Sequence, residues 1–290
     1  MTKQIFIYNP ISGNGKANKF IFNLKNYATE DGYLQDIEVI PTSKPGEAIR
    51  LASACSSCFP TSTIYSVGGD GTLNEIINGI SPNVKLGIIP AGSGNDFYRV
   101  YEQINGTKKI NLGIVNERKF INIASLGIDA KMADTANRIK QSDNKSLAYP
   151  RAIIEEIIKY KPTMMKIDDI ESVRTILTVC NGKYYGNGFP MNPDYNLSDG
   201  FLNVISAGKL SRRQIVVLLL NILREKHLKS PRVMFSKEKN ITVESDIPLL
   251  CNVDGEIFRD TKFNFSVIED GATVTTEVPQ YVKKAIKAIK

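Results

Sequence analysis

The segment Ser66-Val67-Gly68-Gly69-Asp70-Gly71-Thr72-Leu73-Asn74-Glu75 decides the fold of this chain. It joins a β-type run (62–67) to a helical pattern (73–79) and places three glycines within four positions. Because glycine has no Cβ, the backbone turns tightly there and comes close to a ligand. The unpaired N–H groups and the dipole at the start of the following helix favour a phosphate. We therefore expect a nucleotide at this turn.

Part of the pattern also has a purely structural interpretation. Thr72 followed by Glu75 is typical of a capping box, and Gly79 is a suitable helix terminator. Asp70 does not fit that interpretation. A carboxylate beside a polyphosphate is expected mainly where a divalent cation lies between the carboxylate and the phosphates. We expect a functional Asp70.

Strands and helices alternate on both sides of this segment. Strands are expected at 3–8, 36–40, 63–67 and 85–89, with helices near 20–27 and 45–54. Turn-rich loops, 9–15 and 90–96, follow the first and the last of these strands. The alternation predicts a doubly wound parallel sheet, in which ligands bind beyond the carboxyl ends of the strands. The glycine-rich loops would then converge on one crevice.

The character changes near residue 109. Many short strands are expected, at 110–115, 119–125, 164–168, 174–180, 201–206, 241–245, 249–253, 262–267 and 272–277. Helices interrupt them at 146–160 and 212–223. We expect an α/β fold: a nucleotide-binding α/β domain (1–108), then an antiparallel, β-sandwich-like domain (109–278). The tail 279–290 carries the apolar stripe Val282, Ile286 and Ile289; it is expected to pack on the first domain, with lipid contact as the alternative.

Composition restricts the class of protein. The chain has 290 residues, 42% hydrophobic and 23% charged, typical of a soluble globular protein. The first ten residues do not follow a signal-peptide pattern, and the longest apolar run, 215–220, is far shorter than the roughly 20 residues of a membrane span. Four cysteines are typical of a reducing compartment, and Cys55-x-x-Cys58 has no second pair that would make a zinc site. We expect a cytoplasmic protein.

The charge balance favours an anionic partner. Lys and Arg exceed Asp and Glu by seven, which suits a nucleotide or a negatively charged membrane. Nucleic acid ranks low, because there is no RNP-type motif, zinc-finger spacing or concentrated basic helix. The lone histidine, His227, lies among basic residues and is expected on a solvated face. Acid–base chemistry would therefore come from carboxylates or a cofactor.

Four motifs, spread in order over nearly the full chain, resemble the diacylglycerol kinase catalytic-domain family. They are Asn9-Pro-x-Ser-Gly13, Gly68-Gly-Asp-Gly-Thr-Leu-Asn-Glu75, Gly92-Ser-Gly-Asn-Asp-Phe97 and Asp254-Gly-Glu256. The second alone is shared with NAD kinases and phosphofructokinases. The third and fourth point to the bacterial soluble lipid kinases related to sphingosine kinases.

The resemblance implies a lipid kinase that uses ATP and Mg²⁺ to phosphorylate a hydroxyl of diacylglycerol or a related lipid. ATP would bind between the two domains, and the lipid would enter from the second. Glu256 would be the general base, with Asp254 and Asp70 as further catalytic carboxylates. A structural Mg²⁺ would bind the Asn196 and Phe201 carbonyls and Asp199. The nucleotide would be lined by Asn9, Ser12, Gly13, Thr42, Gly68, Gly69, Asp70, Gly71, Thr72, Leu73, Asn74 and Ser93.

Two of these assignments have structural alternatives. Asp254-Gly255 is also a hairpin-turn signal, compatible with catalysis because a tight hairpin holds a carboxylate rigidly. Ser198-Asp-Gly200 is also a plain turn signal. Two positions depart from the family pattern: Asn187 stands where glycine is commoner, and Asn111 where Asp is usual. The first leaves the shape of the lipid entrance open.

Rival functions remain at this point. One is a soluble kinase of the NAD kinase kind, for which the Gly68–Glu75 loop is equally suitable. Another is a non-catalytic, nucleotide-gated lipid-binding or regulatory protein. For the lipid kinase we expect peripheral docking on the inner membrane face. The sequence specifies neither the lipid nor the oligomeric state, which leaves a homodimer open.

Overall fold

The computed structural model describes residues 3–142 and 147–289. Residues 1–2, 143–146 and 290, which fall in predicted elements or domains, lie outside these ranges. The chain divides into two compact units: unit 1 comprises residues 1–112 and 269–290, and unit 2 comprises residues 113–268. Strands β5 (Thr107–Val115) and β14 (Glu256–Thr275) each contribute residues to both units.

Unit 1 is built on a parallel sheet, as the alternation of elements predicts. Its strands run in the order β4-β3-β1-β2, with the end of β14 beside β4. They are β1 (Gln4–Tyr8), β2 (Ile37–Pro41), β3 (Thr63–Gly68) and β4 (Lys85–Pro90). The helices are α1 (Lys16–Glu30), α2 (Glu47–Cys58), α3 (Asp70–Gly79), α4 (Tyr98–Tyr101) and α8 (Gln280–Lys287), with short 3₁₀ turns η1 (Ser12–Gly15) and η2 (Leu34–Asp36).

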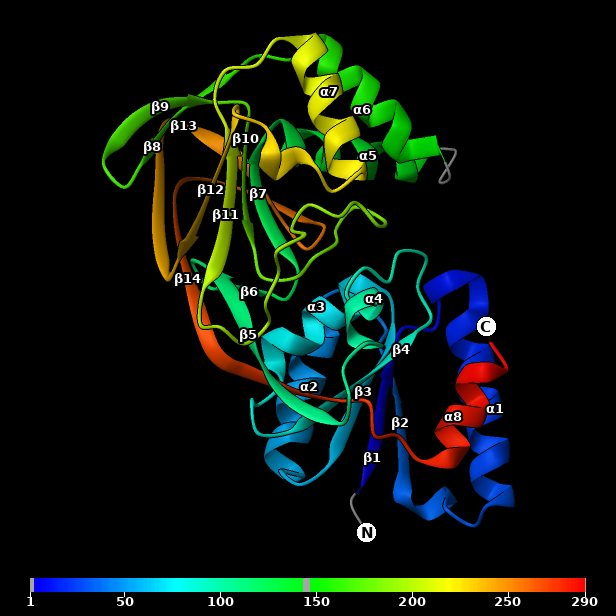
Figure 1. The fold of residues 1–290 in the computed structure, drawn as a ribbon. Coiled ribbons are helices and arrows are strands. Elements are labelled where there is room, and N and C mark those ends of the chain that lie inside the picture. Colours follow the sequence, from blue (N-terminus) through cyan, green and yellow to red (C-terminus); the bar gives the residue numbers. More distant parts are fainter. Residues whose placement is uncertain (1–2, 143–146, 290) are drawn as a thin grey trace. The chain divides into compact units, whose positions relative to one another are not determined.

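Apolar side chains fix the helices to the sheet of unit 1. Phe6 and Tyr65 stack on neighbouring strands, and Phe20 of α1 packs against them. The C-terminal helix α8 joins the same cluster through Tyr281 and Val282 and lies along α1 (Figure 1). Helices α2 and α3 lie on the other side of the sheet (Figure 1).

Unit 2 is an antiparallel β structure with α-helices packed against it. The strand order is β12-β11-β10-β7-β13-β14, with β8 and β9 added at β13. The remaining strands are β6 (Arg118–Phe120), β7 (Ile123–Gly127), β8 (Thr163–Ile167), β9 (Ile170–Arg174), β10 (Ile176–Cys180), β11 (Leu202–Ala207), β12 (Val233–Glu238) and β13 (Asn240–Val253). The helices are α5 (Ile128–Ser142), α6 (Ala148–Lys159) and α7 (Arg212–Leu223), followed by η4 (His227–Lys229).

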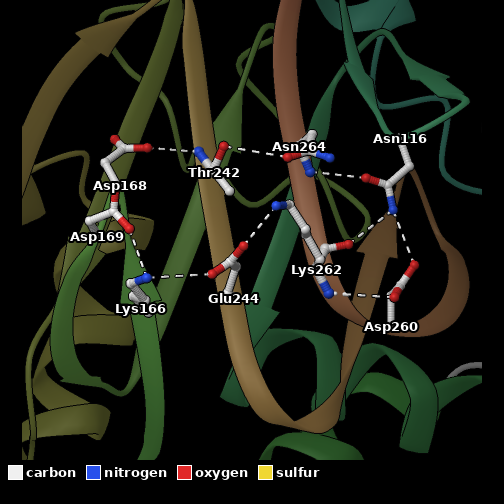
Figure 2. A network of polar contacts seen from close by, with 9 residues as sticks. All are labelled: Asn116, Lys166, Asp168, Asp169, Thr242, Glu244, Asp260, Lys262 and Asn264. Carbon is white, nitrogen blue, oxygen red and sulfur yellow. Dashed lines mark hydrogen bonds and ion pairs between the residues drawn. The ribbon is translucent and has the colours of Figure 1, made fainter.

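A polar network crosses strands β8, β13 and β14 (Figure 2). Lys166 Nζ lies 2.7 Å from Asp169, and Lys262 Nζ lies 2.8 Å from Glu244. The Asp168 carboxylate accepts from the Thr242 N–H at 2.8 Å. The Lys262–Glu244 ion pair links β14 to β13, and the Asp168–Thr242 hydrogen bond ties the end of β8 to β13. These cross-strand contacts contribute to the register of the strands.

Candidate active site

The predicted nucleotide residues meet at one edge of the unit 1 sheet. The chain passes from β1 to β2 on one side and returns to β3 on the other, so the loops after β1 and β3 flank the topological switch point. The loop after β1 contains Asn9, Ser12 and Gly13, and the loop after β3 begins at Gly68. Thr42 follows β2, and Ser93 follows β4.

Close packing between these loops explains several of the glycines. A Cβ on Gly13 would lie 2.0 Å from the Ala91 carbonyl oxygen, and a Cβ on Gly92 would lie 2.2 Å from the Gly69 Cα. A Cβ on Gly68 would meet the Thr72 hydroxyl at 2.4 Å. Gly71 differs from these, because nothing lies within 4 Å of its would-be Cβ. Open space therefore lies beside the first turn of α3.

Helix α3 begins without a side-chain cap. Its N-cap is Gly69, which supplies no side-chain acceptor, and the first N–H groups of a helix have no intrahelical partner. The predicted capping box is wrong: the helix begins at Asp70, which puts Thr72 inside the first turn. Glu75 instead accepts the Ala48 N–H at 3.0 Å, at the start of α2. The helix end is thus left for an anion.

Asp70 ties this helix end to the loop after β4. Its Oδ1 accepts from the Asp96 N–H at 2.7 Å and from the Phe97 N–H at 3.4 Å. Burial raises the pKa of the Asp70 carboxyl, and the backbone N–H groups oppose that shift. Asp70 therefore holds two loops together, and burial makes a negative charge on its carboxyl costly.

The other predicted residues of this edge have distinct surroundings. Asn9 Oδ1 accepts the Ile11 N–H at 3.1 Å and shapes its own loop. Thr42 donates its N–H to the Tyr8 carbonyl at 2.9 Å, and Ser93 is exposed. Leu73 is buried and gives its N–H to the Gly69 carbonyl, so it packs the helix.

The acidic motif forms the predicted tight hairpin of unit 2. Asp254 and Gly255 both have positive φ, 48° and 99°, and join β13 to β14. Such values define the two-residue turns that match the twist of a hairpin. Gly255 donates its N–H to Asn252 Oδ1 at 3.0 Å, and its carbonyl accepts from Asn137 of α5 at 3.2 Å. Glu256 follows this fixed turn, is exposed, and pairs with Val253 across the ladder.

The Asp254 carboxylate is fully engaged with the backbone. It accepts from the N–H groups of Ile121 at 2.8 Å, Asn122 at 3.0 Å and Ile123 at 2.9 Å. These N–H groups bond to a carboxylate instead of to a strand, which is why the strand predicted at 119–125 is interrupted between β6 and β7. The geometry gives Asp254 an orienting role, since it anchors the turn that carries Glu256.

A further carboxyl, Asp129, escaped the sequence analysis. It lies in the first turn of α5, two residues after Gly127, whose φ is 86°. The side chain is buried and accepts a hydrogen bond from the Tyr185 hydroxyl. Burial raises the pKa of the Asp129 carboxyl. The available signal was an acid two residues after a strand-ending glycine.

The predicted metal loop contains a competing cation. Asp199 Oδ1 accepts the Phe201 N–H at 3.1 Å, and Asp199 Oδ2 lies 2.8 Å from Lys237 Nζ. Asn196 Oδ1 accepts the Ser198 N–H. Carbonyl and carboxylate oxygens suit Mg²⁺, but the Lys237 ammonium already balances the one carboxylate. The loop as it stands does not fit a metal.

We expect Lys237 to decide whether this loop responds to Mg²⁺. Without nucleotide, Mg²⁺ should leave the Tm of the wild-type protein nearly unchanged and raise the Tm of Lys237→Met, whose Asp199 is free to bind a cation. Thermal unfolding with Mg²⁺ or EDTA measures this, with Lys237→Arg as the charge-conserving control. A wild-type Tm that depends on Mg²⁺ as strongly as that of Lys237→Met would show that the metal displaces the lysine.

The histidine prediction is wrong. His227 is fully buried, and its Nε2 lies 2.7 Å from the Met191 carbonyl oxygen, because the short turn η4 directs it inward. Its neighbours Lys226 and Lys229 are exposed, as expected. Burial lowers the pKa of His227. The charged neighbours in the sequence concealed a core residue.

The chain combines a glycine-rich parallel unit with a β-rich unit that carries an acidic hairpin. Residues 3–126 match the family model described as the diacylglycerol kinase catalytic domain, and residues 122–275 match the YegS C-terminal NAD kinase beta sandwich-like domain. A diacylglycerol kinase of Staphylococcus epidermidis is 30% identical over 93% of this chain and 90% of the relative. The chain belongs to the diacylglycerol kinase family, and it is a lipid kinase with a nucleotide phosphoryl donor.

Further relatives agree with this assignment. A diacylglycerol kinase of Bacillus subtilis is 27% identical over 88% of this chain and 90% of the relative. A crystal structure of a diacylglycerol kinase from Bacillus anthracis has a TM-score of 0.68 at 19% identity and covers 94% of this chain and 96% of that one. The structural likeness confirms the fold: a parallel α/β domain and an antiparallel β-sandwich-like domain.

Proposed function

We propose that the protein transfers the γ-phosphoryl group of ATP to a hydroxyl of diacylglycerol or a related membrane lipid, with Mg²⁺ and with Glu256 as general base. The observation that carries this proposal is the close packing of the three glycine loops around the start of α3, together with the open space beside Gly71 in the first turn of that helix. Backbone N–H groups at a helix start bind phosphates without a covalent step, and phosphoryl transfer needs positioning and charge stabilisation.

Within this proposal, the chain's residues divide the work. The loops of Asn9–Gly13, Gly68–Asn74 and Ser93, with Thr42, hold the nucleotide, while Asp70 keeps the loops after β3 and β4 together. Mg²⁺ would neutralise charge on the phosphates, and Asp70 is the carboxylate of this edge that suits it. Glu256 accepts the proton of the lipid hydroxyl, and Asp254 fixes the turn that carries it.

The names of the relatives support a lipid substrate, and the basic net charge supports action at a membrane surface. The relatives are named diacylglycerol kinases, and the net charge is +7. Among residues 3–142 and 147–289, no helix has the length and apolar character needed to cross a membrane. We infer peripheral contact with an anionic membrane surface, on the cytoplasmic side where ATP is present.

A substrate panel tests the proposal. The purified protein is incubated with radiolabelled ATP, Mg²⁺ and one of diacylglycerol, a sphingoid base or NAD. We expect label in the organic extract with diacylglycerol and none in NAD. Labelled NADP would favour the NAD kinase alternative. Stoichiometric binding of nucleotide without any labelled product would favour a non-catalytic protein.

Gly71→Ala separates phosphate binding from folding. Alanine fits the space and is less costly than glycine in a helix, so the Tm should not fall. Because the added methyl group occupies the space proposed for phosphate, kcat/KM for ATP should fall by roughly a hundredfold. Thermal unfolding and initial rates measure the two effects. Gly92→Ala is the contrasting control, since its Cβ would clash with Gly69 and lower the Tm. Full activity of Gly71→Ala would place the phosphates elsewhere.

A further inference from the structure

Helix α7 of unit 2 is apolar on the side that faces solvent. Ile215, Leu218 and Ile222 are buried in the core of the unit, as expected for an amphipathic helix. The outward positions should then be polar. Instead they carry four exposed apolar side chains: Val216 (44% exposed), Val217 (55%), Leu220 (45%) and Leu223 (54%). Exposed apolar side chains gathered on one helix face mark a contact with another apolar surface.

The surroundings of this apolar face are strongly basic. The stretch 209–232 holds seven Lys and Arg residues and a single acid, Glu225. Its excess of six positive charges nearly equals the +7 of the whole chain. Glu225 lies 3.0 Å from Lys183 Nζ, so its charge is already paired. The face therefore combines apolar area with uncompensated positive charge.

A groove runs beside the same helix. It has a volume of about 170 Å³, with Leu210, Leu218 and Val233 among its apolar lining residues. Arg213 of α7 and Arg232, just before β12, also line it. Both arginines are exposed, and neither forms an ion pair within the described part of the chain. Two guanidinium groups beside an apolar groove match an anionic headgroup followed by hydrocarbon.

We propose that α7 and this groove form the surface by which the protein docks on an anionic phospholipid bilayer. Val216, Val217, Leu220 and Leu223 enter the interface, while Arg213 and Arg232 bind a lipid phosphate. This rests on the proposed lipid kinase function and assigns its membrane contact to a face. A second copy of the chain fits less well, because a two-fold contact through this face would bring the two basic rims together. Side-chain burial and lipid charge then act together, as in interfacial helices.

The absence of tryptophan from the sequence makes a direct test possible. Leu220→Trp places a single indole on the proposed face, and Phe22→Trp places one on α1, where Phe22 is 66% exposed. Vesicles of phosphatidylcholine with phosphatidylglycerol should shift the fluorescence of Leu220→Trp to the blue and leave that of Phe22→Trp unchanged. Vesicles of phosphatidylcholine alone should cause little shift in the fluorescence of either variant.

Vesicle sedimentation of the full chain supplies the second test. We expect Leu220→Glu, and separately Arg213→Glu with Arg232→Glu, to weaken binding to anionic vesicles by about tenfold or more. Two controls carry the same kinds of change on unit 1: the single variant Phe22→Glu and the double variant Lys25→Glu with Lys283→Glu. Both should bind vesicles like the wild-type protein. Activity on a short-chain diacylglycerol dispersed as monomers should stay unchanged in all of them.

The outcomes separate the docking proposal from the lipid kinase proposal. Undiminished vesicle binding by the α7 variants, or an unshifted Leu220→Trp, overturns the docking surface and leaves the lipid kinase intact. Absent lipid phosphorylation with α7-dependent vesicle binding overturns only the proposed reaction. A wild-type dimer that Leu220→Glu converts to a monomer without any effect on vesicle binding assigns the face to a second copy.

Discussion

Replacing Glu256 by glutamine is expected to lower kcat by about 100- to 10,000-fold, the range that a positioned general base contributes. The amide keeps the size of the side chain and removes its ability to accept a proton. Because Glu256 is exposed at the end of a turn anchored by Asp254, the fold and the KM for ATP should not change. Initial rates of lipid phosphorylation, with thermal unfolding as the check on the fold, measure this.

Two variants control for this result. Glu171→Gln changes an exposed acid on β9 in the same way and should have wild-type activity. Asp254→Asn should lower kcat less than Glu256→Gln does and should also lower the Tm, because the loss of charge weakens three backbone hydrogen bonds. Near-normal turnover of Glu256→Gln would remove this residue from the chemistry.

Asp70→Asn is expected to make the protein more stable and nearly inactive. The asparagine Oδ1 can still accept hydrogen bonds from the Asp96 and Phe97 N–H groups, so the contact between the loops after β3 and β4 persists. The charge proposed to act with Mg²⁺ is lost, and kcat/KM should fall by about a hundredfold or more. Stability gained by removing a functional charge is the usual trade-off at active sites.

The pH dependence of this stability gain has a definite sign. Burial raises the pKa of Asp70 in the folded protein, so the folded state disfavours the carboxylate relative to the unfolded state. The wild-type protein therefore loses stability as the pH rises through that raised pKa, and Asp70→Asn does not. The variant should have the higher Tm at neutral pH, with the difference closing as the pH falls below the ordinary Asp range. A lower Tm at neutral pH would mean that the charge itself stabilises the loops.

The sequence predicted the structure best where the local residue pattern and the place of the segment in the chain point to the same element. The glycine loops follow parallel strands and meet at one edge, because the order of strands and helices imposes that topology. Asp254-Gly255 predicted a hairpin turn, and both residues have the positive φ values that such a turn requires. The helix at 212–223 was predicted with its exact limits.

Tertiary contacts account for what the sequence concealed. Helix α5 was missed because its polar, alanine-containing sequence follows β7 without a capping signal. Glu75 serves a different helix, and His227 lies in the core despite its charged neighbours. Gly13 and Gly92 are explained by backbone packing between loops far apart in the sequence, which composition does not reveal. Asp129 gave only a weak signal, because its burial depends on Tyr185.

A crystal structure of Glu256→Gln with an ATP analogue, Mg²⁺ and a short-chain diacylglycerol would test the central claim most directly. We predict the phosphates against the N–H groups of Gly69–Thr72, with the lipid hydroxyl within hydrogen-bond reach, about 2.6–3.2 Å, of the residue 256 side chain. Phosphates bound away from the start of α3, or a lipid hydroxyl out of reach of residue 256, would contradict the account.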